Sequence, residues 1–205
     1  MKRAAAEAAI RHLPDAGVVG LGTGSTAKIF IDLVGELVRS GRRLVGVPTS
    51  KASRTQAEKL GIPLLADEGP FVVDVCVDGA DEVSDALDLV KGGGGALLRE
   101  KVVNFASKKN VIIVDATKLS PRLGTTWAVP VEVAQFGHAA TAAALARLGR
   151  PTLRRAPLSS SRRRRRRRRA TSRGASYGWL HQRVARRQRT SSATCRASPR
   201  FERTR

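Results

Sequence analysis

The chain has 205 residues, of which 41% are hydrophobic and 4% aromatic. This length suits one large domain or two small ones, and because no run of about 18 apolar residues occurs, no transmembrane helix is expected. The formal net charge of +21 is unevenly divided: residues 1–157 carry 21 basic and 16 acidic side chains, whereas residues 158–205 carry 17 arginines and one acid. The body therefore has the composition of an ordinary soluble domain, and the excess charge belongs to the tail.

The N-terminal residues 1–13 are rich in alanine and interspersed with charges, a pattern typical of an amphipathic helix rather than a signal peptide. Cys76 and Cys195 are isolated, with neither a CxxC pair nor the spacing of metal ligands. This cysteine usage favours a reducing compartment, so we expect a cytoplasmic protein without a disulfide framework.

The first strand is predicted at residues 17–22 and runs into the glycine-rich turn Thr23-Gly24-Ser25-Thr26, after which a helix follows. A strand, such a turn and a helix form a phosphate-binding arrangement, because the helix N-terminus offers unpaired N–H groups and a partial positive charge. The turn matches neither G-x-G-x-x-G nor the P-loop pattern, which argues against a dinucleotide. A hydroxyl-rich cradle for a single phosphate remains, with a plain helix N-cap at Ser25 or Thr26 as the alternative.

Strands and helices then alternate, which predicts a Rossmann-like, doubly wound parallel sheet of the α/β class. The predicted strands are at residues 44–49, 62–66, 71–77, 87–90 and 111–114, and a helix is predicted at 50–60. Beyond residue 125, a strand at 127–137, a helix at 138–149 and a strand at 150–157 indicate the beginning of a small α+β domain. We therefore divide the chain into a catalytic domain at 1–125, an incomplete α+β domain at 126–157 and a tail at 158–205.

Acidic residues and a lysine gather in the stretch from residue 75 to residue 100, where predicted strands end and a helix begins. One strand stops at Asp78-Gly79, and the next ends at Lys91 and four glycines. In the helix that follows, Leu98, Val102 and Phe105 form an apolar stripe, and Glu100 points away from it.

Ligands bind at such strand ends in open α/β sheets. Taken singly, each of these residues also fits a turn, a helix N-terminus or a solvated strand end. The four glycines favour a ligand, because a run of glycines costs backbone entropy and permits close approach.

Four motifs in this order and spacing resemble those of type A ribose-5-phosphate isomerases: GLGTGSTA at 20–27, VDGADEV at 77–83, KGGGGALLREK at 91–101 and DATK at 115–118. The likeness covers about residues 2–155. It implies an aldose–ketose isomerase of the non-oxidative pentose phosphate pathway, without metal or cofactor, that interconverts ribose 5-phosphate and ribulose 5-phosphate through an enediolate. Relatives imply a homodimer or homotetramer.

The resemblance also implies a set of site residues. The family's general base falls on Glu100, and its other catalytic positions fall on Asp78, Asp81 and Lys91. Lys118 matches a phosphate-contacting lysine, and Lys2 aligns with another. The family's substrate-binding positions fall on Thr23, Gly24, Ser25, Thr26, Gly79, Ala80, Gly92, Gly93 and Gly94.

After about residue 157 the likeness ends, and the tail contains no lysine although the body contains nine. This shift in composition favours translation of a GC-rich gene in another frame over a functional arginine arm that binds nucleic acid without specificity. We expect such a tail to be disordered, and we expect the chain to be less active than a complete relative.

A sugar-phosphate-sensing domain of a transcription regulator is the alternative function. Such a domain would normally lack the four residues Asp78, Asp81, Lys91 and Glu100, and the N-terminus leaves no room for a helix-turn-helix. No membrane partner is expected.

Overall fold

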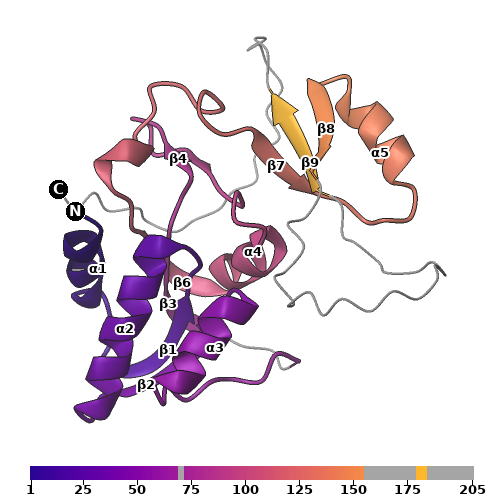
Figure 1. Ribbon diagram of the computed structural model, residues 1–205. Helices are drawn as coiled ribbons and strands as arrows, with labels where there is room; N and C mark the ends of the chain where they lie inside the picture. The colour runs from indigo at the N-terminus through magenta and orange to yellow at the C-terminus, as the bar shows by residue number, and fades with distance from the viewer. Residues whose placement is uncertain (69–71, 155–178, 184–205) are drawn as a thin grey trace, which may run out of the picture. The chain divides into compact units, whose positions relative to one another are not determined.

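The computed structural model describes residues 1–68, 72–154 and 179–183, the last of these as backbone alone. These residues form two compact units, which meet in the sequence between Trp127 and Ala128. Figure 1 shows the elements of both.

A four-stranded parallel sheet in the order β2-β1-β3-β6 forms the centre of the first unit. Its strands are β1 (Ala16–Leu21), β2 (Arg43–Pro48), β3 (Val73–Asp78) and β6 (Ser107–Ile112). Ala16 to Leu21 pair in register with Arg43 to Pro48, and β3 pairs on the other side of β1. The prediction of a parallel α/β sheet is therefore confirmed.

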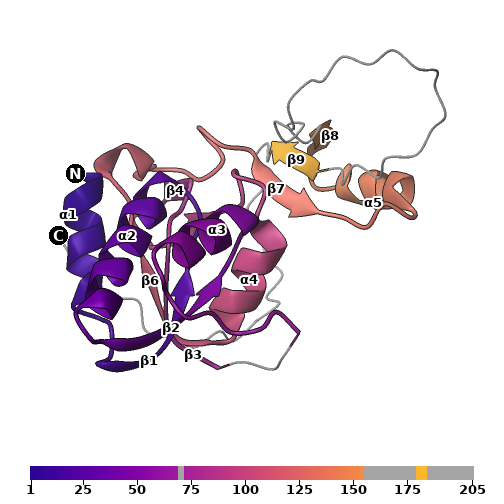
Figure 2. The same ribbon diagram turned by 60° about the horizontal axis from the view of Figure 1, so that its bottom comes forward.

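Helices cover both faces of this sheet (Figure 2). The larger core lies against one face and contains buried residues of α1 (Lys2–Ile10), α2 (Ser25–Arg39) and α3 (Lys51–Lys59). On the other face, Val103 of α4 (Leu97–Phe105) packs in a smaller core with Val73 and Cys76. Burial on both faces is typical of a parallel sheet.

Three predicted strands of this unit differ in the structure. Of the strand predicted at 87–90, only Leu89 and Val90 form a strand. Residues 62–66 make only an isolated bridge between Gly46 and Leu64, because Pro63 has no N–H to donate to a ladder. The strand predicted at 111–114 begins earlier, at Ser107, where polar residues belong to an edge strand that sequence patterning does not reveal.

The apolar stripe of α4 lies on the exposed side of the helix. Leu98, Val102 and Phe105 are 57%, 50% and 86% exposed, whereas Glu100 and Val103 are buried. Glu100 does point away from the stripe, as predicted, but the inward face of the helix is the one that carries the carboxylate. In this orientation the Glu100 carboxylate lies 3.5 Å from Lys91 Nζ.

Two short elements connect the sheet to the site. Strands β4 (Glu82–Val83) and β5 (Leu89–Val90) form an antiparallel pair between β3 and α4. A 3₁₀ turn at Ala116–Lys118 follows β6, with the side chain of Asp115 as its N-cap.

The second unit contains a three-stranded antiparallel sheet in the order β7-β9-β8 and one helix. Its elements are β7 (Val129–Glu132), α5 (His138–Leu145), β8 (Arg150–Arg154) and β9 (Trp179–Arg183). Strand β9 lies within residues 158–205, the tail that we expect to be disordered, and it pairs with β7 and β8. The rest of the predicted tail lies outside the described residues.

Among the described residues, no helix is both long enough and apolar enough to cross a membrane.

Candidate active site

A cavity of about 250 Å³ opens in the first unit, where β1, β3 and β6 end. Ligands are expected at this edge in a parallel sheet. The lining includes Thr23, Gly24, Ser25, Thr26, Gly79, Ala80, Asp81, Lys91, Gly92, Gly93, Gly94, Glu100, Asp115, Lys118 and Trp127. Segments far apart in the sequence therefore meet around one space.

Asp78, the last residue of β3, binds groups from three segments of the site. Its carboxylate is fully buried: Oδ1 accepts hydrogen bonds from the N–H groups of Thr23 (2.9 Å) and Gly79 (2.8 Å). Oδ2 pairs with Lys91 Nζ at 2.9 Å. Gly22 leaves space for this carboxylate, because a Cβ at that position would collide with Oδ1. Asp78 thus fixes Lys91 and the start of the glycine turn without itself lining the cavity.

Glu100 faces Lys91 from the first turn of α4. Its Oε2 lies 3.5 Å from Lys91 Nζ, and within the described residues this oxygen accepts no hydrogen bond. Burial raises the pKa of Glu100 to about 7, and the negative charge of Asp78 acts in the same direction against the attraction of Lys91. Burial alone would lower the pKa of Lys91, but Asp78 and Glu100 outweigh it and raise this pKa. The site therefore holds a firmly charged lysine beside a carboxylate that titrates near neutrality, as a general base requires.

Asp81 approaches the cavity from the loop between β3 and β4. Its Oδ2 accepts a hydrogen bond from Gly93 N–H at 2.7 Å, and a Cβ on Gly93 would lie 2.7 Å from Oδ1. The carboxylate therefore packs directly on the glycine backbone, which explains why a residue without a side chain stands there.

The N-terminus of α2 forms the opposite part of the lining. Gly24 is the N-cap, with φ at +113°, so neither Ser25 nor Thr26 is the cap, and no side chain caps the helix. Lys2 Nζ donates to Ser25 Oγ at 3.0 Å and lies 4.0 Å from Asp115. Free N–H groups at a helix N-terminus, hydroxyls and a lysine are groups that bind an anion.

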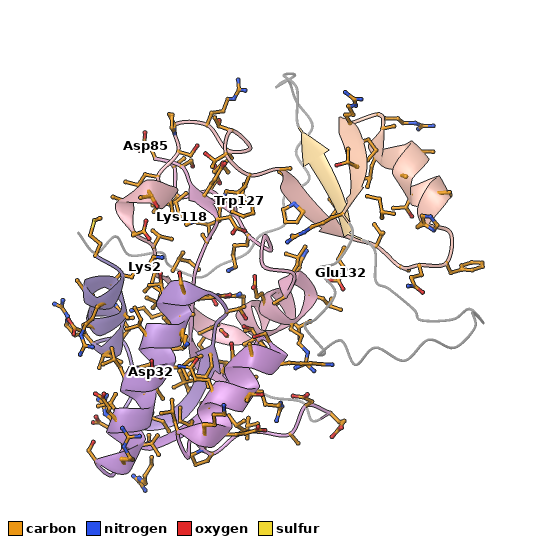
Figure 3. All side chains as sticks on the ribbon, viewed as in Figure 1. Lys2, Asp32, Asp85, Lys118, Trp127 and Glu132 are labelled. Atoms are coloured by element: carbon orange, nitrogen blue, oxygen red, sulfur yellow. The ribbon has the colours of Figure 1, made fainter. Side chains whose placement is uncertain are left out.

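Lys118 and Trp127 complete this end of the cavity, and Figure 3 shows them beside one another. Lys118 Nζ lies 5.6 Å from the centroid of the Trp127 ring. Asp115, whose side chain accepts from Thr117, has a pKa below its usual range because of these hydrogen bonds and the nearby lysines Lys2 and Lys118. Three charged groups and one aromatic ring therefore surround the anion-binding end.

The structure brings together all the predicted site residues, but it puts Asp78 behind the lining rather than in it. Sequence reasoning did not select Asp115 or Trp127. Asp115 carried a signal, since it directly follows a predicted strand within the DATK motif, whereas a single tryptophan after a loop carries none. Among the described residues, no group of three or more His, Cys, Asp or Glu side chains has the arrangement of a metal site.

These features define a Rossmann-like α/β protein whose cavity joins a carboxylate–lysine pair to an anion cradle. The model of the family described as ribose 5-phosphate isomerase A (phosphoriboisomerase A) matches residues 45–173. The chain belongs to this family.

Two curated relatives illustrate the match. The ribose-5-phosphate isomerase A of Desulfatibacillum aliphaticivorans is 50% identical over 151 residues, which cover 73% of this chain and 66% of the relative. That of Nitrobacter hamburgensis is 51% identical over 146 residues, or 71% of this chain and 62% of the relative. The chain thus spans less than two thirds of the length of these relatives.

Solved structures agree. A D-ribose-5-phosphate isomerase in complex with phospho-erythronic acid has a TM-score of 0.76 at 32% identity, covering 89% of this chain and 78% of its own. The ribose 5-phosphate isomerase A of Neisseria gonorrhoeae has a TM-score of 0.71 at 36% identity, covering 88% of this chain and 74% of its own. These relatives do not favour the alternative of a transcription regulator's sensing domain.

Proposed function

We propose that the chain is an aldose–ketose isomerase that interconverts ribose 5-phosphate and ribulose 5-phosphate. The observation that carries the proposal is Glu100, a buried carboxylate with a pKa of about 7, held 3.5 Å from Lys91 in a cavity whose other end is an anion cradle. The cavity is smaller than the roughly 300–1,000 Å³ typical of drug-sized ligands, which suits a five-carbon sugar phosphate.

Glu100 is the proposed general base. Isomerisation requires one group to take a proton from C2 of the aldose and return it to C1 of the ketose. A carboxylate that titrates near the working pH serves both steps, because it binds and releases a proton with little cost. The unpartnered Oε2 of Glu100 leaves an acceptor available for that proton.

Lys91 is the proposed electrostatic partner of the enediolate. As the proton leaves C2, negative charge develops on the sugar oxygens, and preorganised donors stabilise it by roughly 3 kcal/mol each. Lys91 is positively charged and fixed by Asp78, and Gly92, Gly93 and Gly94 line the cavity beside it. In this mechanism Asp78 acts through Lys91 and touches no reacting atom.

The phosphate is assigned to the end of the cavity formed by α2, Lys2 and Lys118. The helix N-terminus and the two lysines complement its charge, and Thr23, Ser25 and Thr26 add hydroxyl groups. A solved relative in complex with phospho-erythronic acid supports a phosphate-carrying ligand for this fold. Binding energy at the phosphate holds the reacting carbons beside Glu100.

Asp81 is assigned to ring opening, which must precede the transfer from C2. It lines the cavity beside the glycine turn, within reach of sugar oxygens. Gly79 and Ala80 line the same wall and are assigned to substrate binding.

The wider setting follows from the same proposal. We assign the reaction to the non-oxidative pentose phosphate pathway in the cytoplasm, and the buried free thiol of Cys76 agrees with a reducing compartment. A homodimer or homotetramer is the proposed assembly, residues 1–125 the proposed catalytic domain and residues 126–157 part of a small α+β domain. Any nucleic-acid binding through the tail concerns residues outside those described.

Proton exchange tests the proposal directly. The chain is incubated with ribose 5-phosphate in D₂O and followed by NMR, which detects slow turnover. We expect ribulose 5-phosphate carrying deuterium at C1, and far less conversion of ribose without its phosphate. If neither ribulose 5-phosphate nor deuterium at a carbon position appears, the chain is not this isomerase.

A further inference from the structure

Glu82 is a buried carboxylate to which the proposed chemistry gives no part. It directly follows Asp81, but it does not line the cavity, and the residue is only 1% exposed. Three backbone N–H groups donate to it: that of Gly124 to Oε2 at 2.6 Å, and those of Thr126 and Trp127 to Oε1 at 2.5 and 2.6 Å. Both oxygens are thus committed to one short loop.

The loop held in this way is the segment from Ser120 to Trp127. Its beginning is fixed to β4 as well, because Ser120 N–H donates to the carbonyl of Val83 at 2.8 Å and Leu119 forms a bridge with Val83. Gly124 has φ at +80°, so the chain turns back there toward Glu82. Two adjacent residues of one short strand therefore fasten both ends of the loop.

The loop limits the anion-binding end of the cavity. Lys118 lies two residues before it, Trp127 is its last residue, and both line the cavity. The Trp127 ring lies 5.6 Å from Lys118 Nζ, so a shift of the loop changes the surroundings of this lysine. The positions of Trp127 and of the groups around Lys118 therefore depend on the contacts that Glu82 makes with the loop.

The same residue belongs to the strand pair on the catalytic side. Glu82 pairs with Val90, which precedes Lys91, and Asp81 N–H donates to the carbonyl of Val90 at 2.7 Å. Glu82 thus stands between the segments that carry the acid–base groups and the loop that carries Trp127.

We propose that Glu82 is a positioning residue that holds the loop 120–127 in place and so sets the affinity of the cavity for the phosphate group. This inference rests on the proposed function for the identity of the anion. Burial alone would raise the pKa of Glu82, but the N–H groups of Trp127, Thr126 and Gly124 outweigh burial and keep this pKa below its usual range. The group is therefore a carboxylate at neutral pH, an acceptor on both oxygens.

The change Glu82→Gln tests this role with little change of volume. One oxygen becomes an NH₂ group, which has no acceptor to offer and meets an N–H of the loop. Because a charge-assisted hydrogen bond is lost, we expect inorganic phosphate to bind about tenfold more weakly. Binding is followed through the fluorescence of Trp127 in a Trp179→Phe background, since the chain has two tryptophans.

Asp74→Asn is the matched control. The Asp74 carboxylate also accepts a hydrogen bond from a backbone N–H, that of Val18 at 2.9 Å, but it lies at the other end of β3 and does not line the cavity. We expect phosphate affinity within about twofold of the parent chain. An equal loss in both variants would show general loosening and would overturn the proposal.

A double-mutant cycle separates positioning from simple stability. If Glu82 acts through the loop on Lys118, the loss caused by Glu82→Gln must shrink when Lys118 is already alanine. A full tenfold loss in both backgrounds would overturn the proposal, as would unchanged phosphate affinity in Glu82→Gln.

Gly124→Ala provides a second route if Glu82→Gln does not fold. It strains the turn at a positive φ without altering the carboxylate, so it must also weaken phosphate binding, and unchanged affinity would count against the proposal. Phosphate binding needs no turnover. A chain that lacks isomerase activity but shows Glu82-dependent phosphate affinity would contradict the proposed function and leave this inference standing.

Discussion

Replacing Glu100 by glutamine removes the proposed base while keeping nearly the same volume in a buried position. The amide cannot accept the C2 proton, so kcat must fall by the share that a general base contributes, about 10²–10⁴-fold. Lys91, Asp78 and the anion cradle remain, and binding of the sugar phosphate must therefore change much less than turnover.

The pKa of Glu100 also predicts how kcat/KM depends on pH. With a value of about 7, the base form is lost as the pH falls, so kcat/KM must rise with pH up to about 7 and level off above it. In the glutamine variant the residual rate must lose this dependence.

The stability of the parent chain must fall as the pH rises, whereas its kcat/KM must increase. The folded state raises this pKa from 4.5 to about 7, so the protonated carboxyl is favoured by folding and its contribution is lost as the pH rises through that range. Replacing Glu100 removes this penalty. From about pH 5 to about pH 8 the variant must therefore gain about 2–3 kcal/mol of stability relative to the parent, as a rise of this pKa from 4.5 to about 7 implies. That pKa already includes the attraction of Lys91.

Steady-state kinetics, phosphate-competition binding and urea unfolding at the two pH values provide the measurements. Glu58→Gln is the control, because it makes the same chemical change on α3, where Glu58 is 3.9 Å from Arg54 and does not line the cavity. A fall in turnover of less than about tenfold in Glu100→Gln would refute its role as the base.

Three further changes probe the rest of the site. Thr26→Val must raise KM by about fivefold and lower kcat less, with inorganic phosphate competing against substrate, and an unchanged KM in steady-state kinetics would count against the cradle. Lys2→Ala must act in the same way, since its ammonium group reaches Ser25 Oγ; an effect on kcat alone would place it elsewhere. Gly93→Ala must lower kcat by about 10- to 100-fold by displacing the Asp81 carboxylate. A kcat near that of the parent in Gly93→Ala would contradict this contact.

Much of the site follows from sequence because its residues stand at strand ends. The turn after β1, Asp78 at the end of β3 and Asp115 after β6 each follow an apolar run, and parallel strands bring such positions to one edge. For α4 the sequence predicted only that Glu100 points away from the apolar stripe, and not that Glu100 points inward. Angular spacing separates Glu100 from Leu98, but it does not tell which side faces the sheet.

Long-range contacts account for the rest. The role of Glu82 depends on N–H groups more than forty residues later in the chain, and no local sequence pattern predicts such a partner. Strand β9 was missed because its five residues have no apolar alternation, and only pairing with β7 and β8 defines it. Likewise, Trp127 lies at the site because a loop returns to β4, which no periodicity encodes.

The buried charge of Asp78 ties assembly of the site to assembly of the whole sheet. One oxygen needs the backbone after β1, the other needs a lysine that arrives after β5, and both come from outside its own strand. Until β1 lies beside β3, burial of the Asp78 carboxylate is unfavourable, because an unpaired buried charge costs free energy. Catalytic geometry and the central sheet should consequently appear in one cooperative step. The amide hydrogens of Thr23 and Gly79 should then exchange with solvent only as slowly as the sheet itself opens, and a partly folded chain with a working site should not accumulate.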